Sequence, residues 1–496
     1  MQADVIFDKE KSPTPTDPKM PPGTWQKEAS APVQDPLPPA NAPPPESRFT
    51  SRPLPPPPQK SIKGLLIKIL LGVLALTLFG FVIIRFILPI FTGGVSQKVE
   101  LTYWGLWENE NTLSGVIKDF ESKNPNIRIK YIKQDIKQYN DTLQTRVNNG
   151  TGPDIYRFHN TWLPMLKEEL LPLPNSVISP NDFRKKYYPV VQRDLVRNGA
   201  IYGIPFEIDT LAMFVNTDIL NQAGVTVPTD WNDFVKSAIK LTVKDTQGRI
   251  KTSGASLGTY DNIRNAPDIL GMLLVQNGAN TTEMSKTSAN AAEAIEFYTS
   301  FAKGGGAMWN DSLEEASLSF ARGNVAFYFG YSWEVFQIQA INPELKFAIH
   351  KVPGLPGRRS SVASYWAEGI STKSKHPKEA MEFLKFLTIE QSVEKIYEAT
   401  SKTRSFGEPY PFVTHASRLK DNKIVYPFVE QAPSATSTYF VSNTYDNGIN
   451  DKMNAYLGNA VRSVLGNTSP QSAVETLSLG ITQILAVYEP KKPTTR

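Results

Sequence analysis

The sequence predicts an α/β body over residues 98–496, preceded by one transmembrane helix and a disordered proline-rich tail. Three observations support this. Strand and helix periodicities alternate after residue 98, a nearly continuous apolar run occupies residues 64–91, and seventeen of the 39 prolines lie in residues 1–60. The body is too large for a single compact sheet domain.

The proline-rich segment, residues 1–60, is expected to be a disordered cytoplasmic tail. Proline lacks an amide donor and fixes φ, so a segment that ends in the run 55–58 builds neither helix nor sheet. The segment also has few large apolar side chains to offset the entropy lost on ordering. A docking site for a proline-recognising partner is the alternative interpretation.

The apolar run, residues 64–91, is predicted to be a transmembrane anchor helix. Sixteen uncharged residues separate Lys68 from Arg85, which is about 24 Å of helix. Snorkelling of these two side chains extends the span toward a hydrocarbon core of about 30 Å. More basic residues precede the run than follow it, which favours a cytoplasmic N-terminus and an extracytoplasmic body. A cleaved signal peptide is the alternative, although no small-x-small cleavage site clearly follows.

Alternating strand and helix patterns open the body. Residues 99–103 alternate as a strand, residues 113–120 carry a helical apolar stripe, and residues 127–131 alternate again. This spacing is typical of a βαβ unit and implies a parallel sheet covered by helices. Residues 211–215 continue the pattern as a strand, and residues 380–387 continue it as a helix.

The composition excludes several classes of protein. The chain has no cysteine, which excludes disulfides, zinc–thiolate sites and thiol nucleophiles. Its net charge of +5 is small and its basic residues are scattered, so we expect no nucleic-acid partner. The four histidines form no i, i+4 pair, and no phosphate-binding, dinucleotide or EF-hand motif occurs. No metal or other cofactor is therefore expected.

Six segments resemble, in order, the family 1 extracellular solute-binding proteins, the group that contains maltose-binding protein. The third of them carries the Gly-x-Gly-Pro-Asp motif of the family, at residues 150–154. The segments are 101–108, 120–131, 148–162, 201–220, 320–338 and 365–388. The resemblance covers nearly all of residues 98–400, extends only loosely over 405–496, and is absent from 1–97.

The resemblance implies a two-lobed periplasmic-binding-protein-like fold, with a hinge of crossing strands and the ligand held between the lobes. The solute-binding domain would span residues 98–490. Lobe one would comprise about residues 98–205 and 367–402. Lobe two would comprise about residues 208–364 and 405–490.

Residues 254–258, Gly-Ala-Ser-Leu-Gly, fit the G-x-S-x-G pattern of hydrolases. A nucleophile elbow needs an apolar strand before it and a helix after it, whereas the polar stretch 249–253 precedes this one. The segment better resembles a lobe-two strand leading to the cleft. We therefore do not expect the chain to be an enzyme.

The expected binding residues follow from the chemistry of sugars, whose apolar faces and hydroxyl rims call for aromatic platforms beside carboxylates or amides. Trp107 and Glu108 directly follow the first strand, at the end where α/β sheets bind ligands. The resemblance adds ligand contact for Phe158, Asn160, Trp162, Glu207, Asp209, Trp333, Tyr365 and Trp366. Core packing is the competing interpretation for the aromatic residues. A solvated loop charge is the competing one for Glu108, and hinge hydrogen bonding is the competing one for Glu207 and Asp209.

These features together predict a membrane-anchored extracytoplasmic solute-binding protein. It would capture a sugar or oligosaccharide and deliver it to the permease subunits of an ABC importer. The tryptophans favour a carbohydrate ligand. An anchored sensor or adhesion module that uses the same cleft is a second hypothesis, kept open by the long N-terminal tail. A tethered glycosidase, which needs two carboxylates about 5–10 Å apart, is a third.

Overall fold

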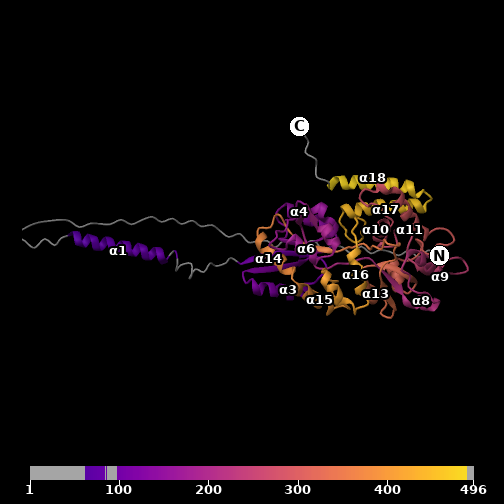
Figure 1. Cartoon of the computed structure of the whole chain (residues 1–496), viewed down its shortest axis with the longest axis horizontal. Helices are drawn as coiled ribbons and strands as arrows, with labels where there is room; N and C mark the ends of the chain where they lie inside the picture. Colours follow the sequence, from indigo (N-terminus) through magenta and orange to yellow (C-terminus); the bar gives the residue numbers. More distant parts are fainter. Residues whose placement is uncertain (1–61, 84, 86–97, 489–496) are drawn as a thin grey trace, which may run out of the picture. The chain divides into compact units, whose positions relative to one another are not determined.

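The computed structural model describes residues 62–83, 85 and 98–488, and the chain divides into two units, residues 1–87 and 88–496 (Figure 1). Helix α1 (Ile62–Val82) belongs to the first unit. The predicted disordered tail, residue 84 and residues 86–91 of the predicted anchor lie outside the described residues. Among the described helices, none is both long and apolar enough to cross a membrane.

The second unit contains two five-stranded sheets. The first sheet has the strand order β2-β1-β3-β12-β6. Strand β1 pairs in parallel with β2 and β3, which confirms the predicted βαβ unit, while β12 runs antiparallel to β3 and β6. The strands are β1 (Val99–Gly105), β2 (Ile127–Lys133), β3 (Ile155–His159), β6 (Ile204–Pro205) and β12 (Trp366–Ile370).

The second sheet has the strand order β11-β7-β10-β9-β8. Strand β7 runs antiparallel to β10 and β11, whereas β9 runs parallel to β10. The strands are β7 (Ala212–Asn216), β8 (Val243–Lys244), β9 (Ile250–Ala255), β10 (Val325–Gly330) and β11 (Phe347–His350). A separate two-stranded sheet joins β4 (Val196–Arg197) to β5 (Ala200–Ile201).

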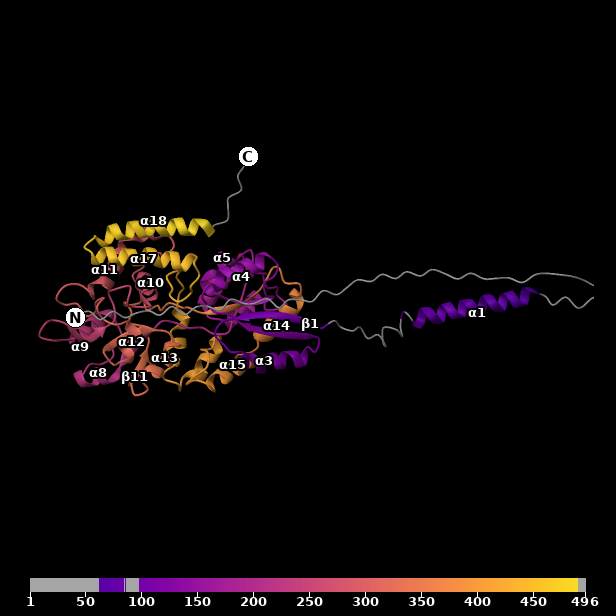
Figure 2. The ribbon, with the colours of Figure 1, turned by 180° about the vertical axis from the view of Figure 1, so that it is seen from behind.

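Helices cover both sheets. Helix α3 packs against α15 on one side of the first sheet and α4 lies on the other, while α17 and α18 lie side by side near α11 (Figures 1 and 2). The α-helices are α3 (Glu110–Lys123), α4 (Tyr139–Asn148), α5 (Leu163–Leu166), α6 (Pro180–Lys186), α7 (Pro189–Leu195), α8 (Thr217–Ala223), α9 (Trp231–Leu241), α10 (Ala266–Gln276), α11 (Ser288–Ser300), α12 (Ala316–Ala321), α13 (Glu334–Ile341), α14 (Pro377–Leu387), α15 (Glu390–Ser401), α16 (Tyr426–Glu430), α17 (Ile449–Leu465) and α18 (Pro470–Tyr488). The 3-10 helices are η2 (Asn160–Trp162), η3 (Met284–Thr287), η4 (Val413–Leu419) and η5 (Ala432–Ser434).

The apolar stripes predicted for two helices are buried as expected. In α3 the buried residues include Leu113 and Phe120, and the helix ends at Asn124, whose side-chain amide donates to the Phe120 carbonyl at 2.9 Å. Helix α14 begins at a proline in its first turn and buries Phe383 and Leu387. A proline at this position costs no hydrogen bond, because the first amides of a helix have no intrahelical acceptor.

The Gly-x-Gly-Pro-Asp motif braces the first sheet. Asp154 accepts a hydrogen bond from the Thr102 amide of β1 at 2.9 Å and another from the Ser374 hydroxyl, after β12, at 2.6 Å. One carboxylate therefore joins the beginning of β3 to both neighbouring strands. Asp154 therefore has a structural role, and its side chain is not among those that line the cavity described below.

Three chain segments cross between the two sheets and hydrogen-bond to one another. The Ile208 amide donates to the Pro409 carbonyl at 3.0 Å, and the Leu211 amide donates to the Val362 carbonyl at 2.9 Å. The crossings therefore lie near residues 206–211, 361–365 and 404–410. The resemblance implies a hinge of crossing strands, and the three crossings are present, but none of them is itself a strand. The residue boundaries given above for the two lobes stay predictions.

The G-x-S-x-G segment continues β9 of the second sheet. The side chain of Ser256 is wholly buried, and its hydroxyl lies 3.5 Å from the Phe327 carbonyl of the neighbouring strand β10. A nucleophile elbow would instead expose this hydroxyl at the top of the sheet. Of this segment, Gly254 and Ala255 belong to β9, which ends before Ser256, so the predicted strand is confirmed for these two residues.

Gly254 is predicted to be required for packing between β9 and α9. A Cβ atom at this position would lie 1.9 Å from the Ala238 carbonyl oxygen of α9, and backbone atoms cannot move aside cheaply. We expect Gly254→Ala to lower the free energy of unfolding by about 1–3 kcal/mol, measured by urea denaturation. Gly305→Ala is the matched control, since no atom lies within 4 Å of its added Cβ. Equal stability of the two variants would contradict the packing described here.

Candidate functional site

A cavity of about 490 Å³ opens where the crossing segments meet the ends of the strands. Its walls come from the loop after β1, the end of β3, all three crossing segments, the beginning of α13 and a loop before α17. The lining residues are Trp107, Glu108, Ile136, His159, Glu207, Asp209, Arg264, Tyr331, Trp333, Phe336, Gln337, Ser364, Trp366, Arg404, Glu408, Ser442, Asn443, Thr444 and Tyr445. Aromatic faces and carboxylates thus share one concave surface, as ligand sites require.

Six of the ten residues expected from the sequence line this cavity. They reach it from segments that are far apart in the chain, at the carboxyl ends of β1 and β10 and on the crossing segments. The six are Trp107, Glu108, Glu207, Asp209, Trp333 and Trp366. The structure therefore brings these side chains together, and contact with a ligand stays a prediction for each of them.

The other four expected residues are buried and do not line the cavity. Phe158 packs against the backbone at Gly203, because the side chains of a strand alternate and His159 takes the cavity side. Tyr365 donates to Asp194 at 2.8 Å, and Asn160 donates to the same carboxylate at 2.9 Å. Direct ligand contact by these side chains does not fit their placement.

Trp162, the fourth of these, supports the cavity wall instead of forming it. Its ring packs edge to face against Trp366, with ring centroids 5.2 Å apart. Trp107 also packs edge to face against Trp366, with ring centroids 5.7 Å apart. Trp366 is 9% exposed and Trp107 is 44% exposed, so the pair presents one fixed ring and one accessible ring to the cavity.

A buried ion-pair network holds Glu108 in place. Arg157 of β3 donates from Nη1 to Glu108 at 2.5 Å and from Nε to Glu368 of β12 at 2.6 Å. Tyr103 of β1 donates to the same Glu368 oxygen at 2.7 Å. Burial alone would raise the pKa of Glu108, but the Arg157 guanidinium outweighs it and the pKa is lowered. Glu108 is therefore ionised and fixed at the cavity wall.

Glu207 and Asp209, on the first crossing segment, differ from Glu108 because their pKa values are raised. Burial raises the pKa of Glu207 well above its usual value, and the nearby Glu408 and Asp209 carboxyls raise it further. Burial raises the pKa of Asp209 to about 8, although the Ser332 amide and hydroxyl donate to it at 2.9 and 2.7 Å. The guanidinium of Arg404 pairs with Glu408 and lies over the Phe336 ring at 4.7 Å.

The loop of residues 442–445 is the part of the lining that sequence reasoning missed entirely. Asn443 and Tyr445 have φ values of 62° and 49°, in the left-handed region that few residues other than glycine adopt. The loop is held by a hydrogen bond from the Ser442 amide to Asp268 at 3.0 Å. The run Ser-Asn-Thr-Tyr-Asp-Asn-Gly at 442–448 is rich in turn-forming residues, which was the only available signal.

Several other lining residues were also missed. His159 and Ser364 form a hydrogen bond of 3.0 Å across the wall, and burial lowers the pKa of His159 to about 3. This imidazole is therefore neutral near neutral pH. Arg264 lines the cavity next to Asn265, outside the segments of clear resemblance.

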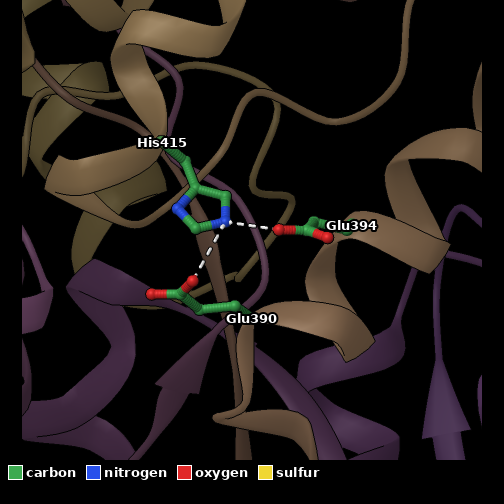
Figure 3. Close-up of side chains that lie close together, drawn as sticks. All are labelled: Glu390, Glu394 and His415. Atoms are coloured by element: carbon green, nitrogen blue, oxygen red, sulfur yellow. Dashed lines mark hydrogen bonds and ion pairs between the residues drawn. The ribbon is translucent and has the colours of Figure 1, made fainter.

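A second group of ionisable side chains lies away from the cavity, where α15 meets η4 (Figure 3). His415 Nε2 is 3.0 Å from a Glu394 oxygen and 3.9 Å from a Glu390 oxygen. Three such donors resemble a metal site, but the Arg418 guanidinium lies 2.5 Å from the same Glu394 oxygen. That oxygen already has a cationic partner, so we interpret the cluster as a link between α15 and η4.

Comparison with known proteins identifies the kind of protein to which the cavity belongs. The family described as bacterial extracellular solute-binding protein matches residues 107–393. A multiple sugar-binding protein of Streptococcus mutans is 26% identical over 325 residues, covering 61% of this chain and 74% of that protein. An arabinooligosaccharide-binding protein of Bacillus subtilis is 28% identical over 324 residues, covering 60% of this chain and 70% of that protein.

Solved structures show the same fold. The sugar-binding protein MalE from Xanthomonas citri has a TM-score of 0.65 at 20% identity, covering 78% of this chain and 98% of that one. A cyclo/maltodextrin-binding protein complexed with maltotetraose has a TM-score of 0.64 at 18% identity, covering 77% and 96%. The resemblance inferred from the sequence and the two-lobed α/β fold are both confirmed.

Arg157 is predicted to be essential for the stability of the first lobe. Arg157→Met leaves two buried carboxylates without their cation, so we expect a loss of about 3–5 kcal/mol at pH 7 in denaturant titrations. The deficit should shrink at pH 5, because unpaired buried carboxyls have raised pKa values and take up protons as the pH falls. Arg128→Met, which breaks an exposed pair with Glu121, should cost at most about 1 kcal/mol. A deficit independent of pH would argue against the network.

Proposed function

Because the chain belongs to the bacterial extracellular solute-binding proteins, we propose that it captures a sugar or oligosaccharide in the 490 Å³ cavity for an ABC importer. The observation that carries the proposal is the lining itself. Trp107, Trp333 and Trp366 offer aromatic faces, and Glu108 offers an ionised carboxylate beside them. Sugars combine apolar C–H faces with hydroxyl rims, which this combination matches.

The geometry of the carboxyl groups favours binding over catalysis. A retaining glycosidase separates its two carboxyl groups by about 5 Å and an inverting one by more. In this cavity Glu207 and Glu408 hydrogen-bond to each other, while Glu108 is bound to Arg157. Relatives named as sugar-binding proteins support the same conclusion. A sensor or adhesion role would depend on residues 1–60, which lie outside the described part of the chain.

We also propose that residues 64–91 anchor the binding domain to the cell membrane, with the domain extracytoplasmic and the N-terminus cytoplasmic. Helix α1 covers the first part of this run, and the apolar sequence continues past its end. Within α1 the sequence from Ile69 to Val82 contains no charged residue. A helix that is hydrophobic all round is buried, either in the core of a large protein or in a membrane.

The binding proposal predicts specific sugar recognition by the tryptophans. A panel of mono- and oligosaccharides that includes maltotetraose and arabino-oligosaccharides should contain at least one saturable ligand, detected by thermal shift and confirmed by calorimetry. A ligand at a hundred times its Kd should stabilise the fold by about 2.7 kcal/mol. Trp333→Ala should weaken binding at least about tenfold, because a stacking platform is lost.

Trp104→Phe is the control for this experiment. Trp104 packs on Tyr139, with ring centroids 6.5 Å apart, and lies outside the cavity lining. Its substitution should leave the affinity unchanged. A flat response to every sugar of the panel would refute the carbohydrate assignment, and release of hydrolysed product would refute the non-enzymatic one.

The anchoring proposal predicts membrane retention that depends on residues 64–91. The full-length chain should stay in the membrane fraction after an alkaline wash and be released by detergent. A variant lacking residues 64–91 should appear in the soluble fraction. Release of the full-length chain by the alkaline wash, or an N-terminus found beyond residue 91, would contradict the anchor.

A further inference from the structure

Two carboxyl groups meet at the base of the cavity, on neighbouring crossing segments. Glu207 lies on the first crossing and Glu408 on the third, and both line the cavity. The backbone hydrogen bond from the Ile208 amide to the Pro409 carbonyl, 3.0 Å long, holds the next residues of the two segments together. The contact between these carboxyl groups is therefore built into the hinge itself.

The two carboxyl groups hydrogen-bond to each other. An ionised carboxylate has acceptor atoms only, so a hydrogen bond between two carboxyl groups requires a proton on one of them. Two carboxyl groups this close do not both ionise near neutral pH. Burial and the neighbouring Glu408 carboxyl raise the pKa of Glu207 well above its usual value, so Glu207 carries the proton of this contact. We call Glu207 and Glu408 the acid pair.

The surroundings of the acid pair leave few other groups that could titrate with it. Arg404 pairs with Glu408, and Arg157 acts on Glu207 from the network beneath; neither guanidinium loses its proton near neutral pH. Arg264 lines the same cavity and is likewise always charged. The neighbouring His159 is neutral because burial lowers its pKa to about 3.

Glu108 and Asp209 are the remaining carboxyls of the cavity lining. Glu108 is held ionised by Arg157. Asp209 has a pKa raised by burial to about 8, and accepts hydrogen bonds from Thr210 and from Ser332. It is therefore the one competitor for a proton in this pH range, and the experiment has to separate it from the acid pair.

We propose that the acid pair of Glu207 and Glu408 makes ligand binding depend on pH, so that the affinity for a neutral sugar falls as the pH rises. The proposal rests on the proposed function, since it concerns the same cavity. A bound sugar removes water from the cavity, and loss of water disfavours the charged form of the pair. Binding therefore favours retention of the proton.

The direction of the effect follows from this linkage. At pH values where the free protein has begun to lose the proton, a neutral ligand restores it, and the affinity falls by up to about tenfold per pH unit for one proton. A ligand that carries an amine would replace the proton with its own positive charge. Its affinity would rise with pH, so the sign of the dependence reports the charge of the ligand.

The test is calorimetry of the full-length chain with maltotetraose and the other sugars of the panel between pH 5 and pH 9. The wild-type affinity for a neutral sugar should fall across this range, with proton uptake detected in buffers of different ionisation enthalpy. Glu207→Gln replaces the shared proton with an amide that cannot titrate, and should abolish both the fall in affinity and the proton uptake. Glu408→Gln should do the same if the first variant does not fold.

Asp209→Asn is the control for the competing carboxyl. The slope of affinity against pH should persist in this variant, whatever its absolute affinity. Wild-type binding that does not vary with pH would overturn the proposal and leave the proposed function standing. A slope that disappears in Asp209→Asn and persists in Glu207→Gln would overturn it as well.

A measurement of stability against pH, made without ligand, tests the acid pair independently of which sugar binds. A carboxyl whose pKa is raised in the folded state stabilises the fold below its unfolded pKa and loses that contribution as the pH rises through the folded pKa. The free energy of unfolding of Glu207→Gln should therefore improve relative to the wild type from pH 5 to pH 9. An unchanged profile would overturn the acid pair. A changed profile with no sugar bound at any pH would overturn the sugar assignment, and with it the pH-dependent affinity.

Discussion

The ion pairs of Arg157 are the interaction on which the rest of the first lobe depends. One guanidinium on β3 binds Glu368 of β12 and Glu108 of the loop after β1. An arginine buried among apolar side chains is tolerated only because both carboxylates neutralise it. The same contacts fix the order of three strands and the position of one wall of the cavity. Stability and binding geometry are therefore not separable at this point of the fold.

Much of the fold could be predicted from periodicity. Helices α3 and α14 and strand β2 each have one buried and one exposed face, so apolar residues recur in their sequences at regular intervals. The stripe that includes Leu113 and Phe120 and the alternation of 127–131 needed no tertiary information. The placement of β12 between β3 and β6 did need it. Strand β12 is buried at every position, so its sequence carries no alternation, and only the family resemblance indicated where the chain returns.

Lining residues that follow the ends of strands could be predicted from the sequence. Residues that reach the cavity or the core only according to how the folded chain buries them were poorly predictable. Trp107 and Trp333 follow β1 and β10, and both line the cavity. Phe158 and Tyr365 have equally suggestive positions, but one packs on a glycine and the other binds Asp194. Pairs such as Glu207 and Glu408 depend on two crossings that lie side by side only in the folded chain. No local sequence pattern indicates that two residues so far apart in the chain will be neighbours.

The insertion of β12 into the first sheet also sets the order in which the two sheets are completed during synthesis. Strand β11 ends at His350 before β12 begins at Trp366, so every strand of the second sheet leaves the ribosome first. Until β12 arrives, β3 has paired with β1 on one side only, and its other edge presents unsatisfied amides and carbonyls. A nascent chain of this protein is therefore exposed to wrong pairing along β3 until β12 is made. The sheet whose first strand is made first is therefore the sheet that is completed last.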